Sequence, residues 1–571
     1  MITSVDAIAE GAAYDIVVIG SGAAGMSAAL FAAIGGVKVL LVERTGLLGG
    51  TSALSAATTW VPNTHHAAAI GADDSLEKTA HFLDQVVGNH SDAALRRAFL
   101  ENAPPAIAAL EAHSDVLFRP YALHPDYVQE AEGATLRGRA LEPLPFDGRQ
   151  LGAAFALLRP PIPEFTVLGG MMVDRTDIGH LLNVTRSWAS FRHAAGLVGR
   201  YLRDRLTHPR GTRLVIGNAL IGRMLLSLLK RDVDILLGTS TTELLHDGGQ
   251  INGLVLECGN DQRRIVVRRG LIMASGGFNQ HKTRRAELLH RPTPVHSPGA
   301  PGNTGEMQDL ALALGARLGA GNLDHAFWAP VSIRRRPDGS TAVFPHFVLD
   351  RGKPGTVSVN KLGRRFVNEA TSYHLFARAM FEANETTPAI PAYLVTDSEG
   401  LRKYGLGMVR PGGRGLQSFL DDGYLTRAPT IAELASKLEI DPAGLTRTIA
   451  DMNRYAETGV DPEFGRGTTA YHNVNGDAAS KPNPNLGPIR TPPYYAVRLY
   501  PGDIGAATGL VTDVDAQVLG PDNRPIGKLY ACGNDMNSIM GGTYPGPGIT
   551  IGPAITFAYL AVRHAIGAAR L

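Results

Sequence analysis

Apolar runs that end in glycine outline the first part of this chain. YDIVVIG, with β-branched residues from Ile16 to Ile19, and VKVLLVER further on show no polar alternation, which predicts strands buried in a parallel sheet. Between them, SGAAGMSAALFAAIGG is rich in alanine and stops at Gly35 and Gly36, as a helix ended by glycine does. Strand, glycine turn, helix and strand make one βαβ unit.

Similar patterns return much later in the chain. RRIVVRRGLIMASGGF predicts an edge strand and then a buried strand with a glycine turn, and GKLYACGND repeats the buried strand and the turn. Glycine-rich GGTYPGPGITIG and an alanine-rich helix up to Leu571 follow. Elements of a nucleotide-binding fold therefore lie in both the first and the last part of the chain.

The middle of the chain mixes strand-like and helix-like patterns with many prolines. We predict an inserted α+β capping domain at residues 334–502, with a return linker in KPNPNLGPIRTPP at 481–493. The remaining residues, 1–333 and 503–571, are expected to form the two parts of a Rossmann-like nucleotide-binding domain. The predicted fold class is therefore α/β.

Composition excludes several classes of protein. The 571 residues are 44% hydrophobic, as in ordinary globular proteins, and a net charge of +2 is too small to indicate nucleic-acid binding. Cys258 and Cys532 indicate neither a disulfide framework nor a zinc site, so we expect a reducing compartment and no metal. Because neither a secretory signal nor an apolar run of about 18 residues is found, we expect a cytoplasmic location.

Residues 186–231 are unusually basic, and Asp204 is the only acid between the first and last cation. Apolar residues interleave with the cations, as in a basic amphipathic helix that rests on an anionic membrane surface. The alternative is a solvated helical face packed on the core. The cations are Arg186, Arg192, Arg200, Arg203, Arg205, Arg210, Arg213, Arg223, Lys230 and Arg231.

The glycine turn GSGAAG follows the first strand and opens the helix. In this context Gly20 permits a tight turn, Gly22 lets the backbone approach a pyrophosphate, and Gly25 lets the helix pack close to the strand. Glu43 ends the second strand, where a carboxylate accepts hydrogen bonds from ribose hydroxyls and disfavours NADP. The turn therefore predicts a dinucleotide, whereas a glycine turn without ligand is the alternative.

Later residues favour FAD over NAD. RTGLLGGTSALS makes a second loop rich in glycine and donors, and the helix after GPGITIG can aim its positive N-terminus at a flavin ring. These features resemble the fumarate reductase and 3-ketosteroid dehydrogenase superfamily of flavoproteins over nearly the whole chain. The resemblance implies non-covalent FAD, bound by Gly20, Ser21, Gly22, Ala23, Ala24, Gly25, Glu43, Arg44, Gly50, Thr51, Ser52, Gly277, Gly533, Asn534 and Ile551.

Tyr373 distinguishes two branches of that superfamily. In fumarate-reducing members, the stretch that resembles FVNEATSYHLF carries an arginine that delivers a proton to the substrate, where this chain has Tyr373. Those members also hold a carboxylate with a histidine near a TxGG turn, whereas GDIGAATGL contains no histidine. A dicarboxylate substrate is therefore disfavoured.

FVNEATSY, YPGDIG, TYPGPGITIGPA and HPDYVQE resemble instead the 3-ketosteroid Δ1-dehydrogenases. The resemblance implies that Tyr373, assisted by Tyr127, takes a proton from C2 of the steroid A ring. It also implies that Tyr544 and the N–H of Gly548 bind the C3 carbonyl. Hydride then leaves C1 for flavin N5 in a step of steroid or sterol degradation, and an external acceptor, quinone-like or a dye, reoxidises the flavin.

These residue types suit the reaction on chemical grounds. Two donors on a ketone oxygen acidify the adjacent C–H and are worth roughly 3 kcal/mol or more. Tyrosine has a pKa of about 10, so we expect neighbouring groups to depress the pKa of a tyrosine base. A neutral phenol also fits an apolar site better than an unpaired arginine. A packed structural role is the alternative for each tyrosine, and Tyr121 competes with Tyr127 for the assisting place.

Departures from the family pattern bear on substrate preference. SAATTW stands where more glycines are usual, AAT follows PGDIG where a lysine–glycine turn is common, and NTGE has glutamate in place of aspartate. Two other functions stay open: a flavin enzyme acting at another steroid position or on a different enone, and a flavin-binding protein without turnover. Tyr544 argues against a 4-ene-forming steroid dehydrogenase, and the base-and-donor set argues against a protein without turnover.

Overall fold

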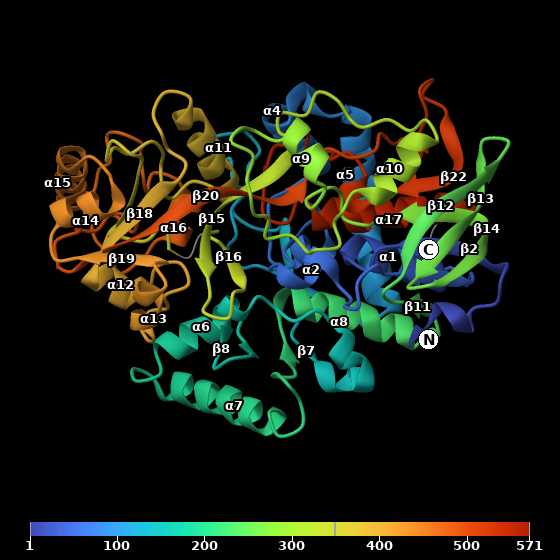
Figure 1. Cartoon of the computed structure of the whole chain (residues 1–571), viewed down its shortest axis with the longest axis horizontal. Coiled ribbons are helices and arrows are strands. Elements are labelled where there is room, and N and C mark those ends of the chain that lie inside the picture. The colour runs from blue at the N-terminus through green and yellow to red at the C-terminus, as the bar shows by residue number, and fades with distance from the viewer. Residues whose placement is uncertain (1, 348–349, 570) are drawn as a thin grey trace.

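A nine-stranded sheet organises the lobe on the right of Figure 1, in a computed structural model that describes residues 2–347, 350–569 and 571. Ile19 of β2 is level with Val42 of β3 and with Met273 of β14, so these parallel strands end at one edge of the sheet. The strand order is β1-β11-β3-β2-β14-β13-β22-β21, with β12 beside β13. The bounds are β1 (Ile2–Thr3), β2 (Ala12–Ile19), β3 (Val39–Val42), β11 (Asp234–Leu236), β12 (Ser240–Asp247), β13 (Gln250–Cys258), β14 (Asp261–Met273), β21 (Gln517–Leu519) and β22 (Pro525–Ala531).

The predicted βαβ unit and the late buried strand are present, which confirms the α/β fold class. RRIVVRRGLIMASGGF differs from expectation, because it forms the single strand β14 and not two strands. Its register against β2 shifts between Val267 and Gly270, so one strand passes the irregularity without ending. The first half pairs with antiparallel β13, and the second half pairs with parallel β22.

Helices cover this sheet through small side chains. α1 (Ala23–Ile34) is buried from Ala23 to Ala32 and contacts α8 (Ile216–Leu229) and α17 (Ile551–Ile566). α17 in turn packs on α5 (Ala93–His113). The alanines allow close approach of the helix backbones, which fixes the N-terminal ends of α1 and α17 near the sheet edge.

A six-stranded sheet forms the lobe on the left of Figure 1. β20 is the long central strand of this sheet: its first half pairs with β18 and β19, and its second half pairs with β15. The prediction of a separate domain at 334–502 stays a prediction, since the sheet itself begins in β15 and ends in β20. The strands are β15 (Ala326–Arg335), β16 (Thr341–Pro345), β17 (Thr356–Val359), β18 (Ala392–Asp397), β19 (Leu425–Ala428) and β20 (Tyr494–Ala506).

Helices of this second lobe pack mainly on its own sheet. α11 (Tyr373–Asn384) contacts β15 and β20, and α15 (Pro442–Thr458) contacts β17. The remaining helices of the lobe are α12 (Ser398–Tyr404), α13 (Leu416–Asp421), α14 (Ile431–Leu438) and α16 (Ala470–Asn475).

The basic segment divides into two helices with opposite surroundings. In α8, Leu225 and Leu228 are fully buried, so the expectation of one surface over residues 186–231 is wrong for this helix. The physical reason is that α8 packs between α1 and the rest of the core, where its apolar side chains are needed. Helix α7 (Trp188–Asp204), which follows α6 (Arg175–Leu182), lies on the outside at the lower edge of Figure 1. Among the described residues, no helix is long and apolar enough to cross a membrane.

Candidate functional site

The glycine turn after β2 leaves no room for a side chain at Gly20 or Gly25. Gly20 has φ 107°, and a Cβ there would lie 2.2 Å from the carbonyl oxygen of Ala274. A Cβ on Gly25 would lie 1.8 Å from the carbonyl oxygen of Gly20. At Gly22, the N-cap of α1, a Cβ would meet only the Ser52 hydroxyl at 3.6 Å. Gly20 and Gly25 therefore close the turn, whereas Gly22 keeps the start of α1 open.

Glu43 lies one residue beyond β3, beside this turn. Its buried carboxylate accepts from the Ser21 N–H at 3.1 Å and from the Thr45 N–H at 2.8 Å. The Thr51 hydroxyl accepts from the Ala300 N–H at 2.9 Å, which ties the second glycine loop to the far wall. Backbone groups therefore fix both loops in place before any ligand is considered.

One cavity receives nearly all of the predicted cofactor residues. Gly20, Ser21, Gly22, Ala23, Ala24, Glu43, Arg44, Gly50, Thr51, Ser52, Gly533, Asn534 and Ile551 all line it. The Arg44 side chain donates to Thr304 and pairs with Glu306, so it lies at the rim. Gly25 supports the turn from behind and does not line the cavity.

The prediction that Gly277 binds the cofactor is corrected, because its neighbour Gly276 lines the cavity and Gly277 does not. The N–H of Gly277 donates to Asp535 at 3.0 Å, and this buried carboxylate also accepts from the Ser275 hydroxyl. Asp535 thus orders the glycine turn after β14. Sequence patterns gave no sign of it, because its partners are about 260 residues away.

The cavity fits FAD in shape and in its polar groups. It runs from the turn at Gly20 and Glu43 to the start of α17 at Ile551. Thr550, the N-cap residue of α17, places no side chain on the helix N-terminus, so that end faces the cavity without a cap of its own. An uncapped helix N-terminus suits the electron-rich edge of a flavin ring.

Three tyrosines meet at the end of this cavity next to α17. The Tyr127 hydroxyl donates to the Tyr373 hydroxyl at 3.3 Å. The Tyr544 ring lies 5.2 Å from the Tyr373 ring and 5.6 Å from the Tyr127 ring. All three are buried, and Phe327 and Phe347 pack around them. The cluster is therefore an aromatic box with hydroxyls inside it.

Each tyrosine is held by its own segment. Tyr127 lies in a loop after β5 (Phe118–Pro120), and its backbone N–H donates to the Pro545 carbonyl at 2.8 Å. Tyr373 is the first residue of α11, after the N-cap Ser372. Tyr544 precedes α17 by a few residues. The predicted competitor Tyr121 lies elsewhere in the cavity, 3.5 Å from the Thr58 hydroxyl.

Gly548 offers a backbone donor beside the tyrosines. It lines the cavity with φ 92°, and a Cβ there would lie 2.2 Å from the Thr58 carbonyl oxygen. Its carbonyl accepts from the Trp60 N–H at 3.2 Å, whereas its own N–H donates to no described residue. A free N–H in a nearly closed aromatic site is a donor that a ligand oxygen can use.

Burial controls the acidity of the three phenols. It raises the pKa of Tyr544 to about 12 and raises the pKa of Tyr127 and Tyr373 well above the ordinary value. The phenols around Tyr373 raise its pKa further. The expectation that neighbouring protein groups depress the pKa of the base is therefore wrong, because burial and the surrounding phenols both raise the pKa of Tyr373.

A fourth tyrosine, Tyr471, lies beside these three and was not among the predicted site residues. It comes from α16 and lines the cavity, with its ring 4.9 Å from that of Tyr127. It is only 2% exposed, and its hydroxyl has no hydrogen-bond partner among the described residues. AYHNVN carries no motif that could have indicated this position.

Arg175 is an unpaired cation that lines the same cavity. It is exposed, its guanidinium lies 5.6 Å from the Tyr121 ring centre, and it forms no hydrogen bond or ion pair with a described residue. Burial, with the charge of Arg175, lowers the pKa of His124 to about 3, so this histidine is neutral. Glu142 and Asp174 also line the cavity, but other arginines already pair with them.

Comparison with known proteins gives consistent matches over nearly the whole chain. The model of the FAD binding domain family matches residues 15–551. The chain is 36% identical over 554 residues to 4-oxocyclohex-2-ene-1-carboxylate 5-dehydrogenase of Sinomonas cyclohexanicum, covering 96% of this chain and 93% of that protein. It is 35% identical to 3-oxosteroid 1-dehydrogenase of Mycobacterium tuberculosis, covering 96% and 98%.

A solved structure is also similar. The crystal structure of 3-ketosteroid Δ1-dehydrogenase from Sterolibacterium denitrificans, in complex with 1,4-androstadiene-3,17-dione, has a TM-score of 0.91 and 34% identity. The match covers 97% of this chain and 99% of that one, so the fold of both lobes is shared.

Proposed function

Because the chain belongs to the FAD-binding flavoprotein family that includes the 3-oxosteroid 1-dehydrogenases, it is an FAD-dependent dehydrogenase, and we propose that it forms the C1–C2 double bond of a 3-ketosteroid. One observation carries the proposal. Tyr127, Tyr373 and Tyr544 converge, with the free N–H of Gly548, on one end of the cofactor cavity.

Each residue has a role in this proposal. The Tyr544 hydroxyl and the Gly548 N–H donate to the C3 oxygen, which stabilises the negative charge that develops as C2 loses its proton. Tyr373, in its phenolate form, accepts that proton and becomes the neutral phenol, and the hydrogen bond from Tyr127 holds the Tyr373 oxygen in place. FAD, when bound, accepts the hydride from C1. Phe327 and Phe347 exclude water from the reacting atoms.

Anaerobic reduction tests the proposal. The oxidised holoenzyme is mixed with 4-androstene-3,17-dione, and the flavin absorbance is followed while the product is identified. We expect bleaching and the 1,4-diene. A double bond at another position would indicate the related enzyme class, and unchanged absorbance with every 3-ketosteroid would contradict the proposal.

A smaller keto acid is the second candidate, and the unpaired Arg175 favours it. One similar protein is named for a cyclohexenone carboxylate. The same donors would bind its ring ketone, and Arg175 would bind its carboxylate through charge-assisted hydrogen bonds. We expect Arg175→Gln to lower kcat/KM for 4-oxocyclohexanecarboxylate by about 10-fold or more while steroid oxidation is unchanged.

The matched control for that variant is Arg186→Gln, which removes another exposed arginine. Equal losses in both variants would show that net charge, and not a carboxylate contact, is responsible. No turnover of the keto acid by the wild-type enzyme, with steroid turnover intact, would exclude the second candidate.

We also propose that the enzyme contacts an anionic membrane surface through α6 and α7. Trp188 is 72% exposed and Leu206 82%, and exposed arginines surround them. Ile178 of α6 lines the cavity, so this surface adjoins the entrance that a lipid-dissolved steroid would use. The other exposed members are Leu182, Phe191, Leu202, Arg186, Arg192, Arg203 and Arg205.

The proposed electron acceptor, a quinone or a dye, is external to the chain.

A further inference from the structure

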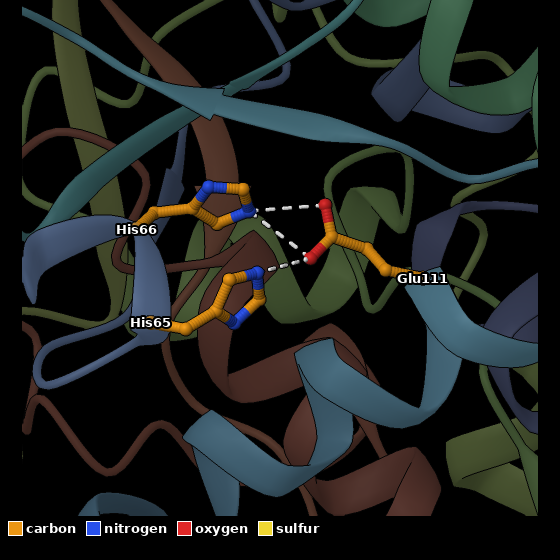
Figure 2. Close-up of side chains that lie close together, drawn as sticks. All are labelled: His65, His66 and Glu111. Carbon is orange, nitrogen blue, oxygen red and sulfur yellow. Dashed lines mark hydrogen bonds and ion pairs between the residues drawn. The ribbon is translucent and has the colours of Figure 1, made fainter. Parts of the chain in front are cut away.

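Two histidines and a glutamate, none of which lines the cofactor cavity, form a cluster (Figure 2). His65 and His66 are the first residues of α3 (His65–Ala69), and Glu111 lies in the last turn of α5. Both Nε2 atoms point at the carboxylate: that of His65 lies 3.0 Å from Oε2, and that of His66 lies 3.0 Å from both oxygens.

A backbone hydrogen bond orients the Glu111 carboxylate toward the two histidines. Glu111 Oε1 accepts from the Phe118 N–H at 2.9 Å, which fixes the group at the start of β5. The imidazole rings are 4.1 Å apart and 36° from parallel, so they present their nitrogens side by side (Figure 2). The Glu111 and His66 side chains are only 12% and 16% exposed, whereas that of His65 is 56% exposed and opens the cluster to solvent.

No permanent cation balances this carboxylate among the described residues. At two other histidine–carboxylate pairs, an arginine joins the histidine at the carboxylate. Asp177 pairs with His193 and also with Arg213, and Asp324 pairs with His290 and also with Arg378. Glu111 has only His65 and His66, which carry a charge only when they are protonated.

We propose that His65, His66 and Glu111 bind a divalent transition metal ion, with Zn²⁺ as the reference ion. Two imidazole nitrogens and one carboxylate oxygen are a common zinc donor set, which leaves a fourth position for water. In such a site donors about 2.0 Å from the metal lie roughly 3.3 Å apart. Here each Nε2 lies 3.0 Å from the carboxylate, and the ligand atoms all lie within 4.8 Å of one another. Binding requires each Nε2 to release its proton or to shift it to Nδ1.

The sequence did not predict this site, because the adjacent histidines and the glutamate are 45 residues apart. A metal there would join α3 to α5 and to the start of β5. The chain reaches α3 from Thr58 and leaves β5 toward Tyr127, and both of these residues line the cavity. The metal would therefore have a structural role outside the reaction itself.

Calorimetric titration of the FAD-loaded enzyme with Zn²⁺ tests the proposal. We expect one Zn²⁺ per chain and a raised Tm. Glu111→Gln keeps an oxygen for the Phe118 N–H but removes the charge, and should weaken binding at least 100-fold. His66→Ala should do the same. His81→Ala, which removes the histidine of another histidine–carboxylate pair, should bind as the wild type does.

Cu²⁺ electron paramagnetic resonance of the wild type gives a test that needs no variant, and two coordinated imidazole nitrogens are expected. The proposal is overturned if Cu²⁺ shows no histidine nitrogen. It is also overturned if Zn²⁺ binds equally to the wild type and to Glu111→Gln, or if no saturable binding occurs.

Discussion

At the nucleotide end of the cavity, Gly20, Ser21 and Glu43 come from one βαβ unit, and adjacent parallel strands bring them together. At the aromatic end, Tyr127 and Tyr373 are 246 residues apart in sequence yet share a hydrogen bond. The first end is formed by backbone turns that tolerate no side chain at Gly20 or Gly25. The second is formed by side chains from both lobes. Substitutions should therefore remove the cofactor at one end and remove the chemistry at the other.

Gly25→Val should have the largest effect, because its first side-chain carbon would lie 1.8 Å from the Gly20 carbonyl oxygen. We expect the purified protein to contain no FAD. Acid precipitation, which should release non-covalent FAD from the wild type, measures this. Gly196→Ala on α7, where nothing lies within 4 Å, should retain the flavin. A yellow Gly25→Val protein would show that the turn is not needed for binding.

Tyr373→Phe should keep FAD and steroid binding but slow flavin reduction by about 10²- to 10⁴-fold, the usual value of a positioned base. Stopped-flow absorbance measures the rate. Exchange of the C2 hydrogen in heavy water should be lost as well. Retained exchange in this variant would assign proton removal to another group.

Tyr544→Phe should slow flavin reduction by about 100-fold, because one of two donors to the ketone oxygen is lost. The backbone donor at Gly548 remains, so the effect is expected to be smaller than that of losing the base. A reduction rate within twofold of the wild type would remove Tyr544 from the proposed site. FAD content, measured in parallel, should not change.

The rate of flavin reduction should rise by about tenfold per pH unit between about pH 7 and 9. Burial holds the pKa of Tyr373 above its usual range, so the reactive phenolate is scarce and its fraction grows as protons are withdrawn. Stopped-flow rates in overlapping buffers give the profile. A plateau below pH 9 would mean that FAD or the substrate lowers the pKa that the protein alone raises.

The double variant Trp188→Ser and Phe191→Ser should leave catalysis within about twofold, because neither residue touches the cavity and surface changes have small effects. It should, however, weaken sedimentation with anionic liposomes at low salt. Val295→Ser, at another highly exposed apolar position, is the control. Equal recovery of wild type and variant in the supernatant at low and high salt, with anionic and neutral liposomes, would contradict membrane contact.

The nucleotide end was predictable from sequence because its determinants are local. Strand, glycine turn and helix follow one another, and Glu43 ends the next strand. The choice between Gly276 and Gly277 was not predictable, since distant Asp535 decides it. The position of Tyr471 and the high pKa of Tyr373 were not predictable from the sequence for a similar reason, because both depend on how the second lobe packs against the first. Helices α7 and α8 differ in composition: α7 has three arginines and a histidine, whereas α8 has one arginine among mostly apolar residues. Treating residues 186–231 as one segment hid this difference, which separates the surface helix from the core helix.

The division of the tyrosines between the lobes has an evolutionary consequence. Tyr373 begins α11, which packs on the sheet of the second lobe, whereas Tyr544 and Gly548 precede α17 in the first lobe. The proposed proton acceptor and the proposed ketone-binding groups could therefore diverge separately within one lineage. Under these proposed roles, replacing the residue at the start of α11 would change the proton-transfer group, while the flavin and its surroundings would be inherited unchanged. One scaffold can in this way pass between oxidation and reduction without a new cofactor site.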